Sequence, residues 1–297
     1  MLVSIVAATY NNKAEVLDFI KSVKNLNFPA KELEVIITDN GSTDKTAQLI
    51  NKQYPEIQLV NLKTNFGASQ ALNIGFKRAK GQYIFKCDSD VILEKDSLKK
   101  LLLFLQNQPK SAIVGPKIFF KDKPNTIAPS AGKFNFWFGT ISAYPNLNKI
   151  LKADYLQGCA ILFPKEIIKK IGYLDEGYGL WLFDDQDFCT QANRKGINIL
   201  YYPEAKIWHS TTLKASARPK IKLEQWYKNK IRFIIKNANL IQILTSIILQ
   251  IITIPIYWIS FRDGTANAIV KGFWWNLNNI KKTLLARKLN VYAVPNG

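Results

Sequence analysis

The sequence contains little that would support disulfide, zinc or phosphate-loop chemistry. It has three cysteines, Cys87, Cys159 and Cys189, which form no C-x-x-C pair, and one histidine, His209. This pattern is typical of a reduced, cytosolic chain rather than of a disulfide framework or a zinc site. Neither G-x-G-x-x-G nor G-x-x-x-x-G-K-[ST] occurs, so the phosphate-binding loops of dinucleotide-binding and P-loop proteins are absent. A phosphate ligand would need another counter-charge, and a metal ion is the natural choice.

Acidic residues are scarce in the last quarter of the chain. Residues 1–213 hold 27 lysines and arginines against 20 acids, a net charge of +7, whereas residues 214–297 hold 14 against 2, a net charge of +12. This basic excess flanks the longest uncharged run, and such a combination favours an anionic membrane surface at least as much as nucleic acid. We therefore expect an N-terminal domain over 1–213 and a separate basic, apolar region over 214–297.

Residues 1–90 alternate between strand-like and helix-like patterns. Apolar, β-branched runs predict buried strands at Leu2–Ala8, Leu33–Thr38, Ile57–Leu62 and Tyr83–Lys86. Helical spacing predicts helices over 14–24, after a cap among residues 42–44, and from Ala68 to a stop at Gly81. Strands that alternate with helices in this way predict a doubly wound, mostly parallel α/β sheet.

Short polar side chains follow the four predicted strands. They are Thr9, Tyr10 and Asn11 after the first strand, Asp39 and Asn40 after the second, Asn65 after the third, and Asp88, Ser89 and Asp90 after the fourth. Ligands of doubly wound sheets bind outside the carboxyl ends of the strands, so we expect these residues to share one rim. Asp88 and Asp90 offer hard oxygen ligands on a tight turn. Such ligands suit Mg²⁺ or Mn²⁺, with phosphate oxygens completing the shell.

Three further acids lie among large apolar residues, at Asp184, Asp185 and Asp187. Burial raises the pKa of an unpaired carboxyl group toward the range that is useful to a general base. The alternative is an ordinary helix N-terminus, where acids interact favourably with the helix dipole. Both interpretations can hold together, with Asp184 or Asp185 catalytic and Asp187 structural.

Taken in order, these motifs resemble the family 2 inverting glycosyltransferases, which have the GT-A nucleotide-diphosphosugar fold, and within them the rhamnosyltransferase-like group. The resemblance covers about residues 3–213. The matching elements are Val3–Asn11, Asp39–Asp44 (D-N-x-S-x-D), Asn65–Gly67 with Asn73–Gly75, Asp88–Asp90 (D-x-D), Gln157–Ala160 with Ile171–Glu176, Phe183–Asp187 (the family's F-E-D-x-D) and Tyr202–His209. Seven elements in the family's order make the resemblance specific.

The resemblance implies roles for these residues. Asp90 would coordinate a divalent metal, Mn²⁺ or Mg²⁺, that bridges the donor diphosphate, with Asp88 and His209 as further ligands. Asp185 would be the general base, with Asp184 beside it in the catalytic pair. The donor nucleotide would contact Thr9, Tyr10, Asn11, Asp39, Asn40, Asn65, Gly67, Asp88 and Ser89, and the acceptor would contact Gly158 and Trp181.

The implied reaction is a single displacement at the anomeric carbon, which inverts its configuration without a protein nucleophile. The metal would stabilise the charge on the leaving nucleoside diphosphate. The resemblance favours UDP or dTDP as the nucleotide, with GDP as an alternative, and a lipid-linked or cell-envelope glycan as the acceptor. The chain departs from the family at Asp184, where a glutamate is usual. The stretch 119–150, which shapes the acceptor side in the family, carries no matching motif.

Three other functions fit parts of the sequence less well than glycosyl transfer does. A catalytically inert membrane adaptor could retain the fold, although intact Asp90, Asp185 and His209 favour an enzyme. A sugar nucleotidyltransferase would have a glycine-rich basic loop after the first strand, which the sequence AATYNN is not. Nucleic-acid binding rests on net charge alone, without a groove-reading motif.

The aromatic residues Phe134, Phe136, Trp137 and Phe138 could be core or an acceptor platform, and we favour core because aromatic clusters usually pack.

The C-terminal region carries two membrane-like patterns. Residues 237–261 are uncharged and dominated by Ile and Leu, but polar interruptions, Pro255 and basic flanks on both sides argue against a simple crossing. Apolar residues from Ile269 to Leu284 recur at helical spacing, which indicates an interfacial amphipathic helix. The alternative is that these helices pack on the N-terminal domain or form a dimer. We expect peripheral or re-entrant monotopic association with the cytoplasmic face of the cell membrane.

Overall fold

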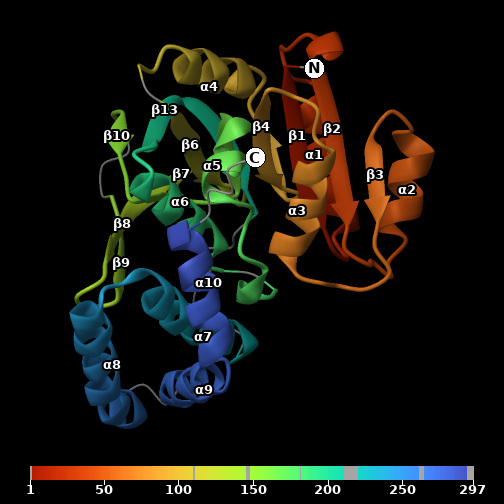
Figure 1. The fold of residues 1–297 in the computed structure, drawn as a ribbon. Helices are drawn as coiled ribbons and strands as arrows, with labels where there is room; N and C mark the ends of the chain where they lie inside the picture. The colour runs from red at the N-terminus through yellow and green to blue at the C-terminus, as the bar shows by residue number, and fades with distance from the viewer. Residues whose placement is uncertain are drawn as a thin grey trace.

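The core of the molecule is a mixed α/β sheet (Figure 1). The computed structural model describes residues 2–109, 111–144, 148–180, 182–210, 220–260 and 264–292. Within these ranges the main sheet has ten strands in the order β10-β13-β6-β12-β4-β1-β2-β3, with β5 beside β13 and β7 beside β6. The α/β sheet expected from the sequence is confirmed.

The first four strands form a continuous parallel segment of the sheet. Its strands are β1 (Val3–Thr9), β2 (Leu33–Asp39), β3 (Gln58–Asn61) and β4 (Tyr83–Asp88), and their neighbours run parallel. They are connected by α1 (Lys13–Lys24), η1 (Ala30–Glu32), α2 (Thr46–Gln53) and α3 (Ala68–Arg78). All four predicted strands are therefore confirmed.

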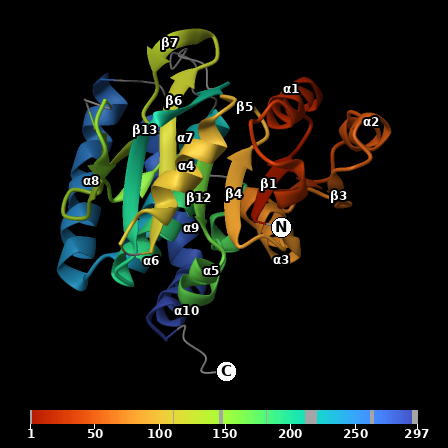
Figure 2. The same cartoon turned by 90° about the horizontal axis from the view of Figure 1, so that it is seen from above.

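The remaining elements of the main sheet complete it with antiparallel pairs. β12 (Ala160–Pro164) runs antiparallel to both β4 and β6 (Ala112–Phe120), while β13 (Asn198–His209) runs parallel to β6. The other elements are β5 (Val91–Leu93), α4 (Ser97–Gln106), β7 (Lys123–Ile127), β10 (Leu151–Lys152), α5 (Glu166–Ile171), η2 (Glu176–Tyr178) and α6 (Asp184–Arg194). Figure 2 shows α1 on one face of the sheet and α3 and α5 on the other. Each face therefore has its own apolar layer, with Phe19 and Leu101 in one and Phe76 and Phe163 in the other.

Two details of the predicted helices differ in the structure. α3 ends at Arg78 rather than at Gly81, because Ala79 already has an extended ψ of 129°. Gly81 serves a close contact instead, since a Cβ atom there would lie 2.6 Å from the backbone nitrogen of Ser4. α2 begins at Thr46, and Asp44 accepts the backbone N–H of that residue at 3.1 Å.

The aromatic cluster divides between core and surface. Phe134 lies on β8 (Ala131–Asn135), which pairs with β9 (Thr140–Ala143) and β11 (Tyr155–Leu156) in a separate three-stranded sheet. Phe134 is buried and its ring centroid lies 4.7 Å from that of Phe233. Trp137 and Phe138 are 48% and 58% exposed. The core expectation is confirmed for Phe134 and wrong for these two, because they lie in the turn between β8 and β9, which leaves the sheet.

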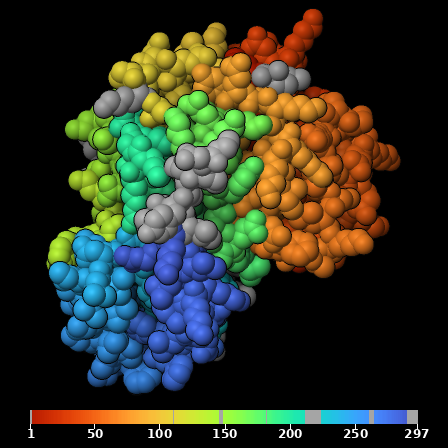
Figure 3. Space-filling model, viewed as in Figure 1, coloured from red at the N-terminus to blue at the C-terminus, as the bar shows by residue number. Residues whose placement is uncertain are grey.

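The C-terminal region is helical and forms a lobe at one end of the molecule, coloured blue in Figure 3. It comprises α7 (Lys220–Asn237), α8 (Leu240–Ser260), α9 (Thr265–Asn278) and α10 (Ile280–Tyr292). The single amphipathic helix expected from Ile269 to Leu284 is instead divided at Asn279. The side-chain amide of Asn279 donates to the carbonyl of Trp275 at 2.9 Å, a local bond that competes with helix continuation.

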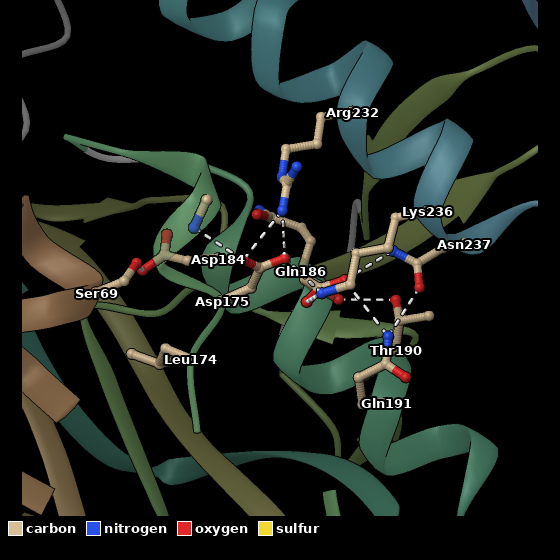
Figure 4. A network of polar contacts seen from close by, with 12 residues as sticks. Ser69, Leu174, Asp175, Asp184, Gln186, Thr190, Gln191, Arg232, Lys236 and Asn237 are labelled. Carbon is tan, nitrogen blue, oxygen red and sulfur yellow. Dashed lines mark hydrogen bonds and ion pairs between the residues drawn. The ribbon is translucent and has the colours of Figure 1, made fainter. Parts of the chain in front are cut away.

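Buried ion pairs attach α7 to α6 and to the loop before η2 (Figure 4). Arg232 contacts Asp175 at 2.9 Å, and the Lys236 ammonium lies 2.7 Å from Asp175 and 2.6 Å from Asp187. The side chain of Lys236 is only 2% exposed. Burial disfavours the Asp175 carboxylate, but Lys236 and Arg232 outweigh it and hold the pKa of Asp175 below its ordinary value. Asp187 also accepts from the Asn237 amide at 2.7 Å, so it joins α6 to α7.

Lys236→Met is expected to destabilise the fold severely. The change keeps the volume of the side chain but leaves the buried Asp187 carboxylate without its cation, a loss of about 3–5 kcal/mol. Urea unfolding followed by circular dichroism measures the effect. The control is Lys281→Met, an exposed lysine of α10, which should change stability by less than about 0.5 kcal/mol. Equal stabilities of the two variants would show that the ion pair does not hold α7 in place.

Candidate active site

The carboxyl ends of β1 and β2 bring the first polar residues together. Thr9 and Asp39 are partners in the parallel register and both are buried. The hydroxyl and the backbone N–H of Ser42 both donate to the Asp39 carboxylate, the second at 3.1 Å. The hydroxyl oxygen of Thr9 has no hydrogen-bond partner among the described residues. A fixed carboxylate and an unpaired buried hydroxyl thus lie side by side at this edge.

A second group of polar contacts fixes the adjoining loops. The Asn40 amide donates to Asn65 at 2.8 Å, and Asn65 accepts the backbone N–H of Gly67 at 2.9 Å. Gly67 has a φ of +94°, and a Cβ atom there would collide with the carbonyl of Gly179. Asn11 accepts the backbone N–H of Thr43 at 2.7 Å. These predicted donor-side residues therefore form one connected loop structure beside Tyr10, which is 46% exposed.

Asp88, Asp90 and His209 form a cluster suited to a divalent metal. β13 ends at His209, whose register partner on β5 is Val91, the residue after Asp90. The His209 Nε2 atom therefore lies 3.1 Å from Asp90 and 3.9 Å from Asp88, and one potential ligand atom from each residue lies within 4.8 Å of the others. Two carboxylates and an imidazole are ligands that Mn²⁺ accepts. The predicted metal ligands are thus brought together from distant parts of the chain.

Asp90 and His209 each favour the charged form of the other. Burial opposes the charged forms of both groups, but the hydrogen bond and the charge of each partner outweigh it. The pKa of Asp90 is lowered and that of His209 is raised. A bound metal ion would take the place of the His209 proton and offset the negative charge of Asp88 and Asp90. Ser89, between the two aspartates, is buried.

Lys86 lies under this cluster and was not anticipated from the sequence. It is 5% exposed, 3.1 Å from an oxygen of Asp88, and also donates to the carbonyl of Gly158. Burial would lower the pKa of its ammonium, but Asp88, Asp184 and Asp185 outweigh burial and raise it. The available signal was a single lysine inside the apolar strand YIFKCD, because a charge is rarely placed in a buried strand without a partner.

Asp184 and Asp185 begin α6 and are both buried. The Asp185 carboxylate accepts the backbone N–H of Gly158 at 2.7 Å, and Asp184 accepts the hydroxyl of Ser69 on α3 at 3.1 Å. Burial, followed by the charge of Asp184, raises the pKa of Asp185 to about 7. A carboxyl group that titrates there is matched to proton transfer at neutral pH.

The close approach of Asp185 leaves no room for a side chain at Gly158. A Cβ atom at this position would lie 2.6 Å from the Cβ of Asp185, so a larger residue would displace the carboxylate. The predicted acceptor residue Gly158 therefore lies directly against the predicted base. The other predicted acceptor residue, Trp181, lies outside the described residues.

The fold and the polar residues at the carboxyl ends of its strands identify the class of protein. This mixed sheet has parallel strands that lead into D-N-x-S-x-D and D-x-D loops. Together with the helix that begins at Asp184 and with His209, it has the GT-A architecture of nucleotide-sugar transferases. The sequence model named glycosyl transferase family 2 matches residues 4–172, more than half of the chain. The chain belongs to this family, and the resemblance seen in its sequence is confirmed.

Relatives and solved structures agree with this assignment. The chain is 27% identical over 209 residues to the poly-beta-1,6-N-acetyl-D-glucosamine synthase of Staphylococcus epidermidis, covering 69% of this chain and 49% of the relative. It thus spans about half the length of the curated relatives it matches. Staphylococcus aureus TarS in complex with UDP superposes with a TM-score of 0.60 at 21% identity, covering 99% of this chain and 81% of that one. The mannosyltransferase PcManGT of Pyrobaculum calidifontis with GDP-Man and Mn²⁺ gives 0.61 at 16% identity, covering 99% and 88%.

Lys86→Met is expected to raise the pKa of Asp185 above about 7, because it removes the cation that favours the ionised carboxylate. Carbon-13 NMR of labelled aspartate measures the titration, with Asp185→Asn assigning the signal. Lys86→Arg, which retains the charge, should leave the pKa near 7. The exposed Lys80→Met is the control. An unchanged titration in Lys86→Met would show that the ammonium does not act on Asp185.

Proposed function

We propose that the protein is a metal-dependent, inverting glycosyltransferase. It moves a sugar from a nucleoside diphosphate sugar, UDP or dTDP being favoured, to a lipid-linked or cell-envelope glycan. The observation that carries the proposal is the placement of Asp185, a carboxyl group with a pKa of about 7, on the same rim as the Asp88, Asp90 and His209 cluster. Relatives named as glycan synthases, and a neighbour solved with UDP, support it.

In this proposal each residue has a chemical task. Asp88, Asp90 and His209 would hold Mn²⁺ or Mg²⁺, which when bound neutralises charge on the diphosphate. The acceptor hydroxyl oxygen bonds to the anomeric carbon from the face opposite the diphosphate, while the bond from that carbon to the diphosphate oxygen breaks. Asp185 takes the proton of the hydroxyl. Gly158 orients the carboxylate through its N–H, and Lys86 offsets the charge that gathers among the acids.

The ionisation of Asp185 gives the proposed reaction its pH dependence. A general base must be deprotonated, so the rate should rise as the pH increases through about 7. The same raised pKa stabilises the folded state at lower pH, where the folded chain binds a proton that the unfolded chain releases. Activity and stability should therefore change in opposite directions between pH 5 and 8.

A nucleoside diphosphate is expected to stabilise the protein only when a metal is present. UDP, dTDP, GDP, ADP and CMP, each with and without Mn²⁺, would be compared by thermal shift. Asp90→Ala removes a metal ligand and should abolish the shift. Asp185→Asn should retain it while lowering the transfer rate by about 10²–10⁴-fold.

The matched control for Asp90→Ala is Asp122→Ala, which removes an exposed acid from the turn before β7. It should behave like the wild type. If no nucleotide stabilised the wild-type protein with Mn²⁺, the transferase proposal would be wrong and an inert membrane adaptor would replace it. A nucleotide shift that survives Asp90→Ala would instead place the metal elsewhere.

We further propose that residues 1–213 form the catalytic domain and that residues 214–297 attach it to the cytoplasmic face of the cell membrane. α8 is the one described helix long and apolar enough to cross a membrane, and few of its residues are buried. Ile252 and Ile259 are 58% and 81% exposed, and Trp274 of α9 is 64% exposed. Large apolar side chains gathered on one lobe, with a net charge of +12 in the same region, support peripheral or re-entrant binding to anionic lipid.

Binding to lipid vesicles is expected to depend on both apolar contact and charge. The protein should sediment with vesicles of phosphatidylglycerol and phosphatidylcholine, and less with phosphatidylcholine alone or at high salt. Ile252→Asp should reduce binding, because it places a charge on the exposed face of α8. Gln106→Asp introduces the same charge at the exposed end of α4 and should have no effect. Equal binding of both variants would contradict the proposed membrane face.

A further inference from the structure

A cavity of about 390 Å³ lies between α6, the three-stranded sheet and α7. Its apolar wall is made by Phe134, Phe136 and Phe233, and its polar wall includes Asp154, Gln186 and Asn193. This volume is in the range of small-molecule sites, which combine an apolar lining with a few placed polar groups. None of these residues belongs to the donor, metal or base groups of the candidate active site.

The aromatic wall is rigid and partly open. The ring of Phe136 lies 4.6 Å from Phe134 and 5.4 Å from Phe233, and is nearly parallel to the latter at 25°. Phe134 and Phe233 are buried, whereas Phe136 is half-buried and lines the cavity. A ring held by two others presents a fixed apolar surface. The C–H faces of a pyranose ring stack on such a surface, so Phe136 matches the platform alternative weighed for this segment.

The polar wall contains an unsatisfied group. Gln186 is only 8% exposed, and its side-chain oxygen has no hydrogen-bond partner among the described residues. Leaving a buried amide oxygen without a partner is costly, and a ligand hydroxyl would offset that cost once the side chain turned this oxygen toward the cavity. Nearby, Asp154 accepts the backbone N–H of Phe134 at 3.1 Å, and Asn193 donates to the carbonyl of Asp154 at 3.1 Å. These bonds fix the polar rim without using the Gln186 oxygen.

The cavity borders the proposed base. Gln186 follows Asp185 in the first turn of α6. Tyr155, which also lines the cavity, lies close enough to Asp185 that this carboxylate, after burial, contributes to raising the pKa of the tyrosine. An extended molecule whose reacting hydroxyl meets Asp185 could therefore continue past Tyr155 into the cavity.

We propose that this cavity is a subsite for a neutral sugar unit of the acceptor glycan, distinct from the unit that is glycosylated. The inference rests on the proposed transferase function. The sugar would place its C–H face on Phe136 and donate a hydroxyl to the Gln186 oxygen, which is covered in the structure and would turn toward the cavity to accept it. An alkyl chain of a lipid would match the aromatic wall but leave that oxygen unpaired, so the chemistry favours a saccharide.

The test is binding of neutral trisaccharides to the full chain, without donor. The probes are β-1,6- and β-1,4-linked N-acetylglucosamine trisaccharides, cellotriose and maltotriose, followed by saturation-transfer NMR and titration. We expect at least one to bind, and Phe136→Ala and Gln186→Met each to weaken it by about fivefold to tenfold. Phe138→Ala, an exposed phenylalanine of the same turn that does not line the cavity, should bind like the wild type.

Thermal stabilisation by UDP and Mn²⁺ is measured on the same proteins and should be unchanged in all three variants. If UDP and Mn²⁺ bind but no trisaccharide does, the subsite is wrong and the transferase proposal stands. Trisaccharide binding that is unaffected by both Phe136→Ala and Gln186→Met also overturns the subsite. Displacement of the trisaccharide by decanoate would assign the cavity to an acyl chain instead. Failure of UDP and Mn²⁺ to bind would reject the proposed function itself.

Discussion

The ammonium group of Lys86 is the charge on which the candidate site depends. It is buried at the end of β4, bonded to Asp88 and to the carbonyl of Gly158, and within electrostatic reach of Asp184 and Asp185. Without it, the buried carboxyl groups of Asp184 and Asp185 would lie near Asp88 with no ammonium group to offset their charge, a costly arrangement. One lysine thus allows the Asp88–Asp90 turn and Asp185 to lie on the same rim.

A second buried cation links this site to the C-terminal helices. Lys236 of α7 contacts Asp175 in the loop before η2 and Asp187 in the first turn of α6, two residues after the proposed base. The helix that positions Asp185 is therefore held from one side by the sheet and from the other by α7. The apolar helix α8 begins three residues after α7 ends, so α7 connects α6 with the lobe that carries this apolar surface.

Much of the candidate site could be predicted from the sequence because its residues follow strands. Asp39 and Asp88 end strands whose apolar, β-branched runs are easily recognised, and the parallel arrangement brings such ends together. Lys86 and Ser69 were missed, because neither belongs to a motif and their partners are far away in the chain. The boundary at Gly81 was wrong because the glycine serves a contact with Ser4 on another strand, which local pattern does not report.

Local patterns in the sequence are enough to identify the family, the alternation of strands and helices, and the concentration of charge and apolar residues near the C-terminus. These follow from local propensity, periodicity and motif order, which act over a few residues. It takes the folded molecule to bring His209 to Asp90, to raise the pKa of Asp185 to about 7 and to place Gln186 in the wall of a cavity. Such properties arise from burial and from contacts between residues far apart in the chain, such as His209 and Asp90, whose distances are set when the sheet forms.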